Sequence, residues 1–226
     1  NGLTLIVHED RTVPTVTTNV WYHVGSGDEK VGRTGFAHLF EHLMFMGSKN
    51  APYPQFDRLL EAAGANNNGS TTGDRTNYYE LFQATDDNLK WAIAMEADRM
   101  VNSFIRKSDL NTEMTVVRNE FEQGENDPQQ ALDVEINAAA ITAHPYHHST
   151  IGWRSDIENV PIERLKGFYR KYYQPDNAIL VVAGKFDEAA VLKRIAQLFG
   201  RIPRPNREGD NHLWPTYTVE PVQDGE

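Results

Sequence analysis

The sequence predicts an α+β fold, and three observations indicate it. Residues 3–7 and 13–24 are apolar and β-branched, with the partial alternation that is typical of strands. Residues 36–46 form an apolar segment that suits a helix and is too short to cross a membrane. Residues 179–183 are a continuous apolar run, which indicates a buried central strand. The chain therefore contains both strands and helices.

The other elements follow in order and are bounded by turn and capping residues. Residues 76–84 favour another strand. Further helices are expected at residues 54–63, 86–100, 108–125, 129–141, 161–172 and 188–199. The expected capping residues are Asp86 with Asp87, Ser108 or Asp109, and Asp187. Glu96 and Asp98 are expected to be surface charges, and residues 217–219 are a candidate edge strand.

Composition narrows the class of protein. The chain has 226 residues and 39% hydrophobic content, enough for one large or two small domains with a sizeable core. Its net charge of −10 argues against nucleic acid as a partner, because phosphate binding needs a basic face. It has no cysteine, which excludes disulfides and cysteine-ligated zinc. No membrane span is visible, so we expect a soluble protein of the bacterial periplasm or cytoplasm.

His38, Glu41 and His42 are the strongest chemical signal. In a helix they stand at positions i, i+3 and i+4, which share one face. Two imidazoles on one face can hold one zinc ion with a carboxylate beside them, and the spacing matches the inverzincin pattern. Histidines four apart also occur by chance. However, three ionisable groups on so apolar a helix are costly to bury unless a metal compensates them.

Glu113 and Glu120 form a second acidic pattern, on the helix expected at residues 108–125. They are seven residues apart and so project within about 20° of each other. Val116 and Val117 are expected on the same stripe, and a carboxylate pair in line with valines is unusual for a solvated face. The alternative is a charged helix edge beside a core seam.

The small polar segment 66–73 has two interpretations. It is either a solvated loop or an exposed edge strand. In the second case the backbone around Asn68, Gly69, Ser70 and Thr71 can pair with an incoming peptide.

Three histidines, His144, His147 and His148, stand close together around Pro145. Their spacing on a proline-containing loop fits no standard metal site, and neutral loop histidines are common. We therefore expect the zinc site at the helical motif and not at this loop.

With these residues, the chain resembles the pitrilysin/insulinase family of zinc peptidases, which includes insulin-degrading enzyme and the mitochondrial processing peptidase. The motif at residues 38–42 and the glutamate pair, at close to the family's usual separation, carry the resemblance. Residues 73–79, 144–146 and 173–184 resemble other family segments, so the likeness spans nearly the whole chain. It implies a mainly antiparallel sheet covered by helices, a metallohydrolase domain of the mitochondrial-processing-peptidase type.

The resemblance also implies the roles of the site residues. One Zn²⁺ ion per chain is expected, held by His38, His42 and Glu120. Glu41 is expected to be the general base that takes a proton from water and passes it to the leaving amine. Glu113 is expected to be a supporting acid that orients a ligand or water.

A second homologous half is the implied partner, since family enzymes are built from repeated domains that face each other. Residues 1–226 correspond to one such domain, either the N-terminal half of a two-domain enzyme or one subunit of a heteromer. The expected function is that of a zinc endopeptidase acting on extended, unstructured peptides. One alternative is a non-catalytic structural or peptide-binding subunit, against which the intact motif argues. Another is a zinc hydrolase with a non-peptide substrate.

Overall fold

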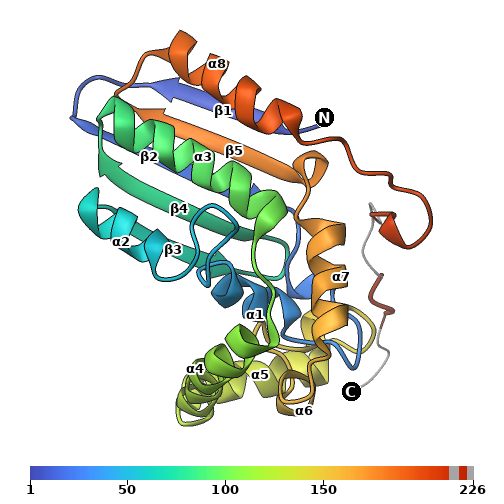
Figure 1. The fold of residues 1–226 in the computed structure, drawn as a ribbon. Helices are drawn as coiled ribbons and strands as arrows, with labels where there is room; N and C mark the ends of the chain where they lie inside the picture. The colour runs from blue at the N-terminus through green and yellow to red at the C-terminus, as the bar shows by residue number, and fades with distance from the viewer. Residues whose placement is uncertain (214–218, 223–226) are drawn as a thin grey trace.

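A sheet of five strands forms the centre of the structure (Figure 1). The computed structural model describes residues 1–213 and 219–222. Within these residues the strand order is β1-β5-β2-β4-β3. The strands are β1 (Thr4–Glu9), β2 (Thr15–Tyr22), β3 (Asn66–Thr71), β4 (Thr76–Gln83) and β5 (Ala178–Gly184). Tyr217 and Thr218 of the predicted strand at 217–219 lie outside the described residues.

β5 is an interior strand of the sheet, although it comes from the last third of the chain. It lies between β1 and β2, parallel to β1 and antiparallel to β2. The β2–β4 and β3–β4 pairs are antiparallel. The prediction of a mainly antiparallel sheet with residues 179–183 as a central strand is therefore confirmed, with one parallel pair in addition.

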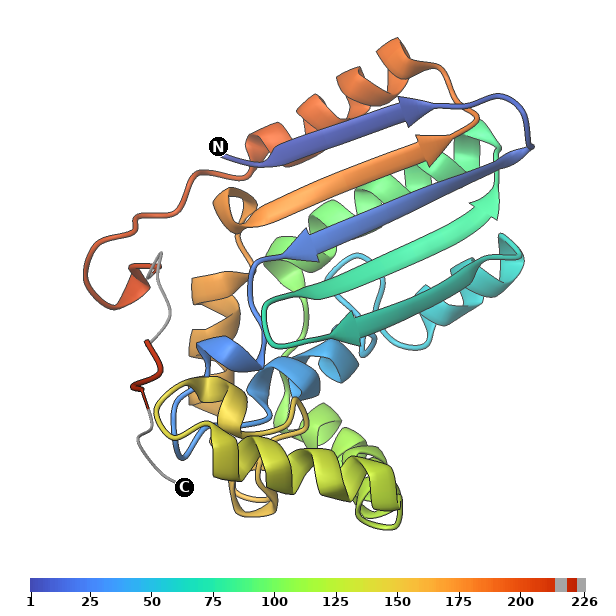
Figure 2. The same cartoon turned by 180° about the vertical axis from the view of Figure 1, so that it is seen from behind.

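The two faces of the sheet differ, as β2 shows. Val16, Thr18, Val20 and Tyr22 are buried, whereas the residues between them are only partly buried. Helices α3 (Asp86–Asn102) and α8 (Glu188–Leu198) cover one face of the sheet in Figure 1. Seen from behind in Figure 2, the strands lie in front of these helices. The main hydrophobic core therefore lies between the sheet and its helical layer.

Most other helices gather at one end of the sheet (Figures 1 and 2). They are α1 (Phe36–Leu43), α4 (Lys107–Glu125), α5 (Pro128–Ala140), α6 (Arg154–Ile157) and α7 (Ile162–Tyr172), while α2 (Gln55–Ala62) precedes β3. Short 3₁₀ turns occur at Ser26–Asp28, Pro145–His147, Pro175–Asn177, Phe199–Arg201 and Gly209–Asn211. A helix long and apolar enough to span a membrane is absent from residues 1–213 and 219–222.

The helix starts agree with the predicted caps in only one of three cases. Asp187 caps α8, as predicted, by accepting the Ala190 amide at 2.7 Å. The cap of α3 is Thr85, one residue before the predicted aspartates, because its hydroxyl reaches the amide at the third helical position. α4 begins at Lys107 without a side-chain cap, because Asp109 is bonded to Arg106 instead.

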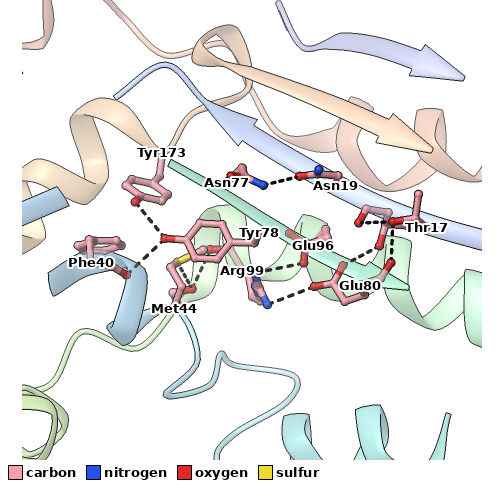
Figure 3. A network of polar contacts seen from close by, with 12 residues as sticks. Thr17, Asn19, Phe40, Met44, Asn77, Tyr78, Glu80, Glu96, Arg99 and Tyr173 are labelled. Atoms are coloured by element: carbon pink, nitrogen blue, oxygen red, sulfur yellow. Dashed lines mark hydrogen bonds and ion pairs between the residues drawn. The ribbon is translucent and has the colours of Figure 1, made fainter. Parts of the chain in front are cut away.

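α3 carries a buried ionic cluster where the sequence indicated surface charges. Glu96 and Asp98 are 0% and 6% exposed, so that prediction is wrong. Figure 3 shows Arg99 between Glu96 and Glu80 of β4, at 3.3 and 3.5 Å. Asp98 instead accepts hydrogen bonds from Asn50. These carboxylates can be buried because Arg99, on the same helix as Glu96, and Asn50, from another part of the chain, compensate them.

Candidate metal centre

α1 is a short helix with one apolar face and one ionisable face. It begins after Gly35, whose φ of +85° and close approach to the Ile151 carbonyl leave no room for a side chain. On the opposite side from the core lie His38, Glu41 and His42. The buried face is made of Phe36, Ala37, Leu39, Phe40 and Leu43.

Two buried tyrosines hold α1 against the sheet (Figure 3). Tyr78 of β4 donates to the Phe40 carbonyl at 3.4 Å, and the hydroxyls of Tyr78 and Tyr173 are 3.1 Å apart. Phe40 directly precedes Glu41, so this contact fixes the backbone between the two histidines. Sequence reasoning missed the tyrosines, because no local pattern links residues 40, 78 and 173.

His38, His42 and Glu120 come together between α1 and α4. Oε2 of Glu120 lies 3.6 Å from Nε2 of His38 and 3.4 Å from Nε2 of His42. Ligand atoms that surround a zinc ion tetrahedrally at 2.0–2.1 Å stand about 3.3 Å apart. The three groups, whose ligand atoms lie within 4.8 Å of one another, therefore fit a zinc ion in both chemistry and spacing.

The charge state of His38 suits a metal ligand. Burial, together with a smaller effect of the neighbouring His42, lowers the pKa of His38 to about 4. The ring is therefore neutral at neutral pH, which is the form that binds a metal ion.

Glu113 lies behind His42, two turns before Glu120 on α4. Its Oε2 is 3.2 Å from Nδ1 of His42, and its side chain is 10% exposed against 40% for Glu120. A carboxylate oxygen accepts, so we assign the proton to Nδ1. That tautomer leaves the lone pair of Nε2 facing Glu120. The sequence did not indicate which group Glu113 contacts, and the structure shows that this group is His42.

The predicted valine stripe beside the two glutamates is half wrong. Val117 is 0% exposed and Glu113 is also buried, but Val116 is 41% exposed. Neighbouring residues on a helix point about 100° apart, and α4 turns the Val117 side toward the core.

Glu41 points from α1 toward the end of β3. Its Oε2 accepts a hydrogen bond from Oγ1 of Thr71 at 2.5 Å. Burial raises the pKa of Glu41, and the charge of Glu120 also raises it. A carboxyl group with a raised pKa beside two imidazoles can both take up and return a proton.

β3 is an edge strand next to α1. Of the two interpretations of residues 66–73, the edge strand is therefore confirmed and the solvated loop is wrong. Within the described residues it pairs only with β4. The Thr72 amide donates to the Arg75 carbonyl at 2.9 Å. Backbone groups alternate along an antiparallel pair, so those of Asn68 and Ser70 face β4 and those of Gly69 and Thr71 face outward.

Gly69 lets β3 lie close to Glu41 of α1. A Cβ atom at this position would lie 2.9 Å from Cγ of Glu41 and 3.2 Å from the Phe45 ring. A larger residue would therefore push Glu41 or the strand out of place.

The loop histidines lie apart from this cluster and bond to their own backbone. His144 Nδ1 accepts the Tyr146 amide at 3.1 Å, and His147 Nδ1 contacts the His144 carbonyl at 2.9 Å. His148 is buried and bonds to the Ser149 carbonyl through Nδ1 at 2.9 Å. These contacts indicate that the loop histidines have a structural role.

Two family models match parts of this chain. Residues 4–153 match the family model described as insulinase, peptidase family M16. Residues 159–226 match a model described as the peptidase M16 inactive domain. The two matched ranges share one sheet, because β5 lies between β1 and β2.

Relatives match the whole of this chain. The chain is 32% identical to the zinc protease PqqE of Helicobacter pylori, over 100% of this chain and 50% of that protein. A crystal structure of a protease from Helicobacter pylori has a TM-score of 0.90 at 31% identity, over 100% of this chain and 53% of that one. The crystal structure of pitrilysin has a TM-score of 0.83 at 26% identity, over 99% of this chain and 24% of that one. The chain spans about half the length of the curated relatives it matches.

Proposed function

Since the chain belongs to the insulinase family of peptidases, family M16, we propose that it is a zinc-dependent endopeptidase that cleaves extended, unstructured peptides. The observation that carries the proposal is the convergence of His38, His42 and Glu120 with the spacing of zinc ligands. These three residues hold the ion, one per chain. The name of the relative from Helicobacter pylori, a zinc protease, supports the choice of metal.

The residues around the ion divide the remaining work. A zinc ion supplies Lewis-acid chemistry, since it polarises a carbonyl group and lowers the pKa of water. Glu41 takes the proton of the attacking water on a carboxylate oxygen and passes it to the leaving nitrogen. Thr71 orients that carboxylate through its hydrogen bond, and Glu113 holds the His42 ring in the tautomer that presents Nε2.

The substrate lies along β3 in this proposal. The outward backbone groups of Gly69 and Thr71 pair with an extended peptide, which adds a strand to the sheet. Gly69 and Thr71 also contact Glu41, so a peptide in this register runs past the general base. The backbone groups of Asn68 and Ser70 face β4. Oδ1 of Asn68 accepts the outward Gly69 amide at 2.8 Å, a bond that a bound peptide replaces, and Oγ of Ser70 accepts a hydrogen bond from Arg75.

We expect residues 1–226 to act as one domain that needs a second homologous half, in the same chain or in another. The support is that the chain spans about half the length of its relatives. The residues described here hold the peptide from one side only, and positioning contributes about 7–11 kcal/mol in favourable cases. The 226-residue chain alone should therefore bind zinc but cleave a peptide slowly, and adding the second half should restore turnover. Full turnover without it would contradict the two-half proposal.

The direct test compares Glu41→Gln with Glu125→Gln, a control at an exposed position of α4. Metal analysis should give about one zinc per chain in both variants. Turnover of an unstructured peptide should fall by roughly two to four orders of magnitude in Glu41→Gln, the usual worth of an acid–base group, and stay unchanged in the control. A non-catalytic subunit would bind peptide with equal affinity in both and cleave it in neither. A hydrolase for other substrates would bind zinc but not peptide.

A further inference from the structure

The N-terminus of α1 is capped from outside the helix. Gly35 occupies the capping position and has no side chain to satisfy the first amides. Glu29 supplies both acceptors: its Oε2 accepts the Gly35 amide and its Oε1 the Ala37 amide, each at 2.7 Å. Ala37 directly precedes His38. The carboxyl group of Glu29 therefore determines where the first turn of this helix begins.

His148 packs against the same carboxyl group. Its Nε2 lies 3.9 Å from Oε2 of Glu29, and the two side chains are 1% and 0% exposed. The Ser149 carbonyl can only accept, so Nδ1 of His148 carries a proton and donates it there. Nε2 is buried and has no hydrogen-bond partner. A neutral His148 therefore turns a lone pair toward Glu29.

The separation of 3.9 Å is longer than a hydrogen bond, and a single proton on one of the two atoms would let them approach and form one. Two facing lone pairs without a proton would be costly in a buried place, and two protons would charge it. Burial raises the pKa of Glu29 to about 8 and lowers the pKa of His148, so both groups resist carrying a charge. The other ionisable groups that act on the two residues are Asp28, Asp156, His147 and Tyr172.

We propose that Glu29 and His148 form a positioning pair that holds one proton between them and fixes the N-terminus of α1, and with it His38. The proposal rests on the proposed function only for the role of His38 as a zinc ligand. His42, one turn later, has its own support from Glu113. The pair should therefore affect His38 more than His42.

The first measurement is amide hydrogen exchange in the metal-free protein. Glu29→Gln keeps the shape but can offer an acceptor to only one of the two amides. Exchange at Gly35 and Ala37 should become roughly tenfold faster, in line with the usual loss of a helix cap. Asp187→Ala is the matched control, because it removes the cap of α8 and should accelerate only that helix. Equal exchange in Glu29→Gln and the wild type would overturn the proposal.

The second measurement follows the proton and the metal ligand. In ring ¹⁵N spectra, Glu29→Gln should shift the Nε2 resonance of His148. If that variant fails to fold, the Nε2 resonance of the wild-type protein can be read instead. A free, unshifted Nε2 in the wild type would overturn the pair. With Co²⁺ as the probe, the visible spectrum should change in Glu29→Gln and not in Asp187→Ala. An equal change in both variants would mean a general loss of stability and would contradict the positioning role.

The milder variant His148→Gln keeps an acceptor, its amide oxygen, for a proton on Glu29 and should restore most of the protection that His148→Leu loses at Gly35 and Ala37. Equal loss in both variants would contradict a role for a shared proton. If Co²⁺ does not bind at all, the proposed zinc site is wrong, while the exchange and ring spectra still decide the positioning pair.

Discussion

Replacing Glu113 by alanine should weaken zinc binding without removing a ligand. The lost contact is the 3.2 Å bond from Nδ1 of His42, and it is largely shielded, since the Glu113 side chain is 10% exposed. A hydrogen bond to a charged group contributes about 1.5–3 kcal/mol. Each 1.4 kcal/mol is a factor of about ten, so the Kd for zinc should rise about 10- to 100-fold.

The assay for this prediction is a competition titration with a chromophoric chelator, with Glu125→Ala as the control on an exposed face of the same helix. Glu113→Gln should fall between the two, because its amide oxygen still accepts but carries no charge. If Glu113→Ala and Glu125→Ala bind zinc equally well, Glu113 does not support His42.

Three further predictions concern the base, the core and the substrate strand. Gly69→Val should lower turnover while zinc stays bound, because a Cβ atom there would lie 2.9 Å from Cγ of Glu41; loss of the metal together with turnover would mean general damage. Arg99→Met should leave two carboxylates buried without their cation and destabilise the fold by about 3–5 kcal/mol, measured by denaturation. An unchanged midpoint would contradict the ionic cluster. Asn67→Pro removes an amide that faces away from β4 and should weaken binding of an extended peptide but not of zinc, so equal peptide affinity would exclude pairing along β3.

Local patterns predicted much of the framework. The helix that carries the motif was predicted from the apolar run at residues 36–46, although it ends at Leu43. Helix geometry of 3.6 residues per turn places His38, Glu41 and His42 on one face. The continuous run at residues 179–183 indicated a central strand, because a strand buried on both sides needs apolar residues throughout. The helix capped by Asp187 followed from the same kind of local chemistry.

Errors arose where a residue's environment depends on a distant part of the chain. Glu96 and Asp98 look like surface charges on their own helix. Arg99 stands only three residues after Glu96, but the fold alone buries this pair beside Glu80 and brings Asn50 to Asp98. Charge in a sequence indicates exposure because burial without partners is costly, and the distant partners Glu80 and Asn50 are not visible in a local window.

By itself the sequence determined the chemistry available, since the identities of the two histidines and the acidic residues are independent of the fold. It also determined their spacing within each helix, because helix geometry is local. Only the tertiary structure decided that Glu120 meets both histidines, that Glu113 contacts His42, and that Glu29 and His148 hold the start of α1. These contacts join segments far apart in the chain, so they depend on how β5 closes the sheet and how α4 crosses α1.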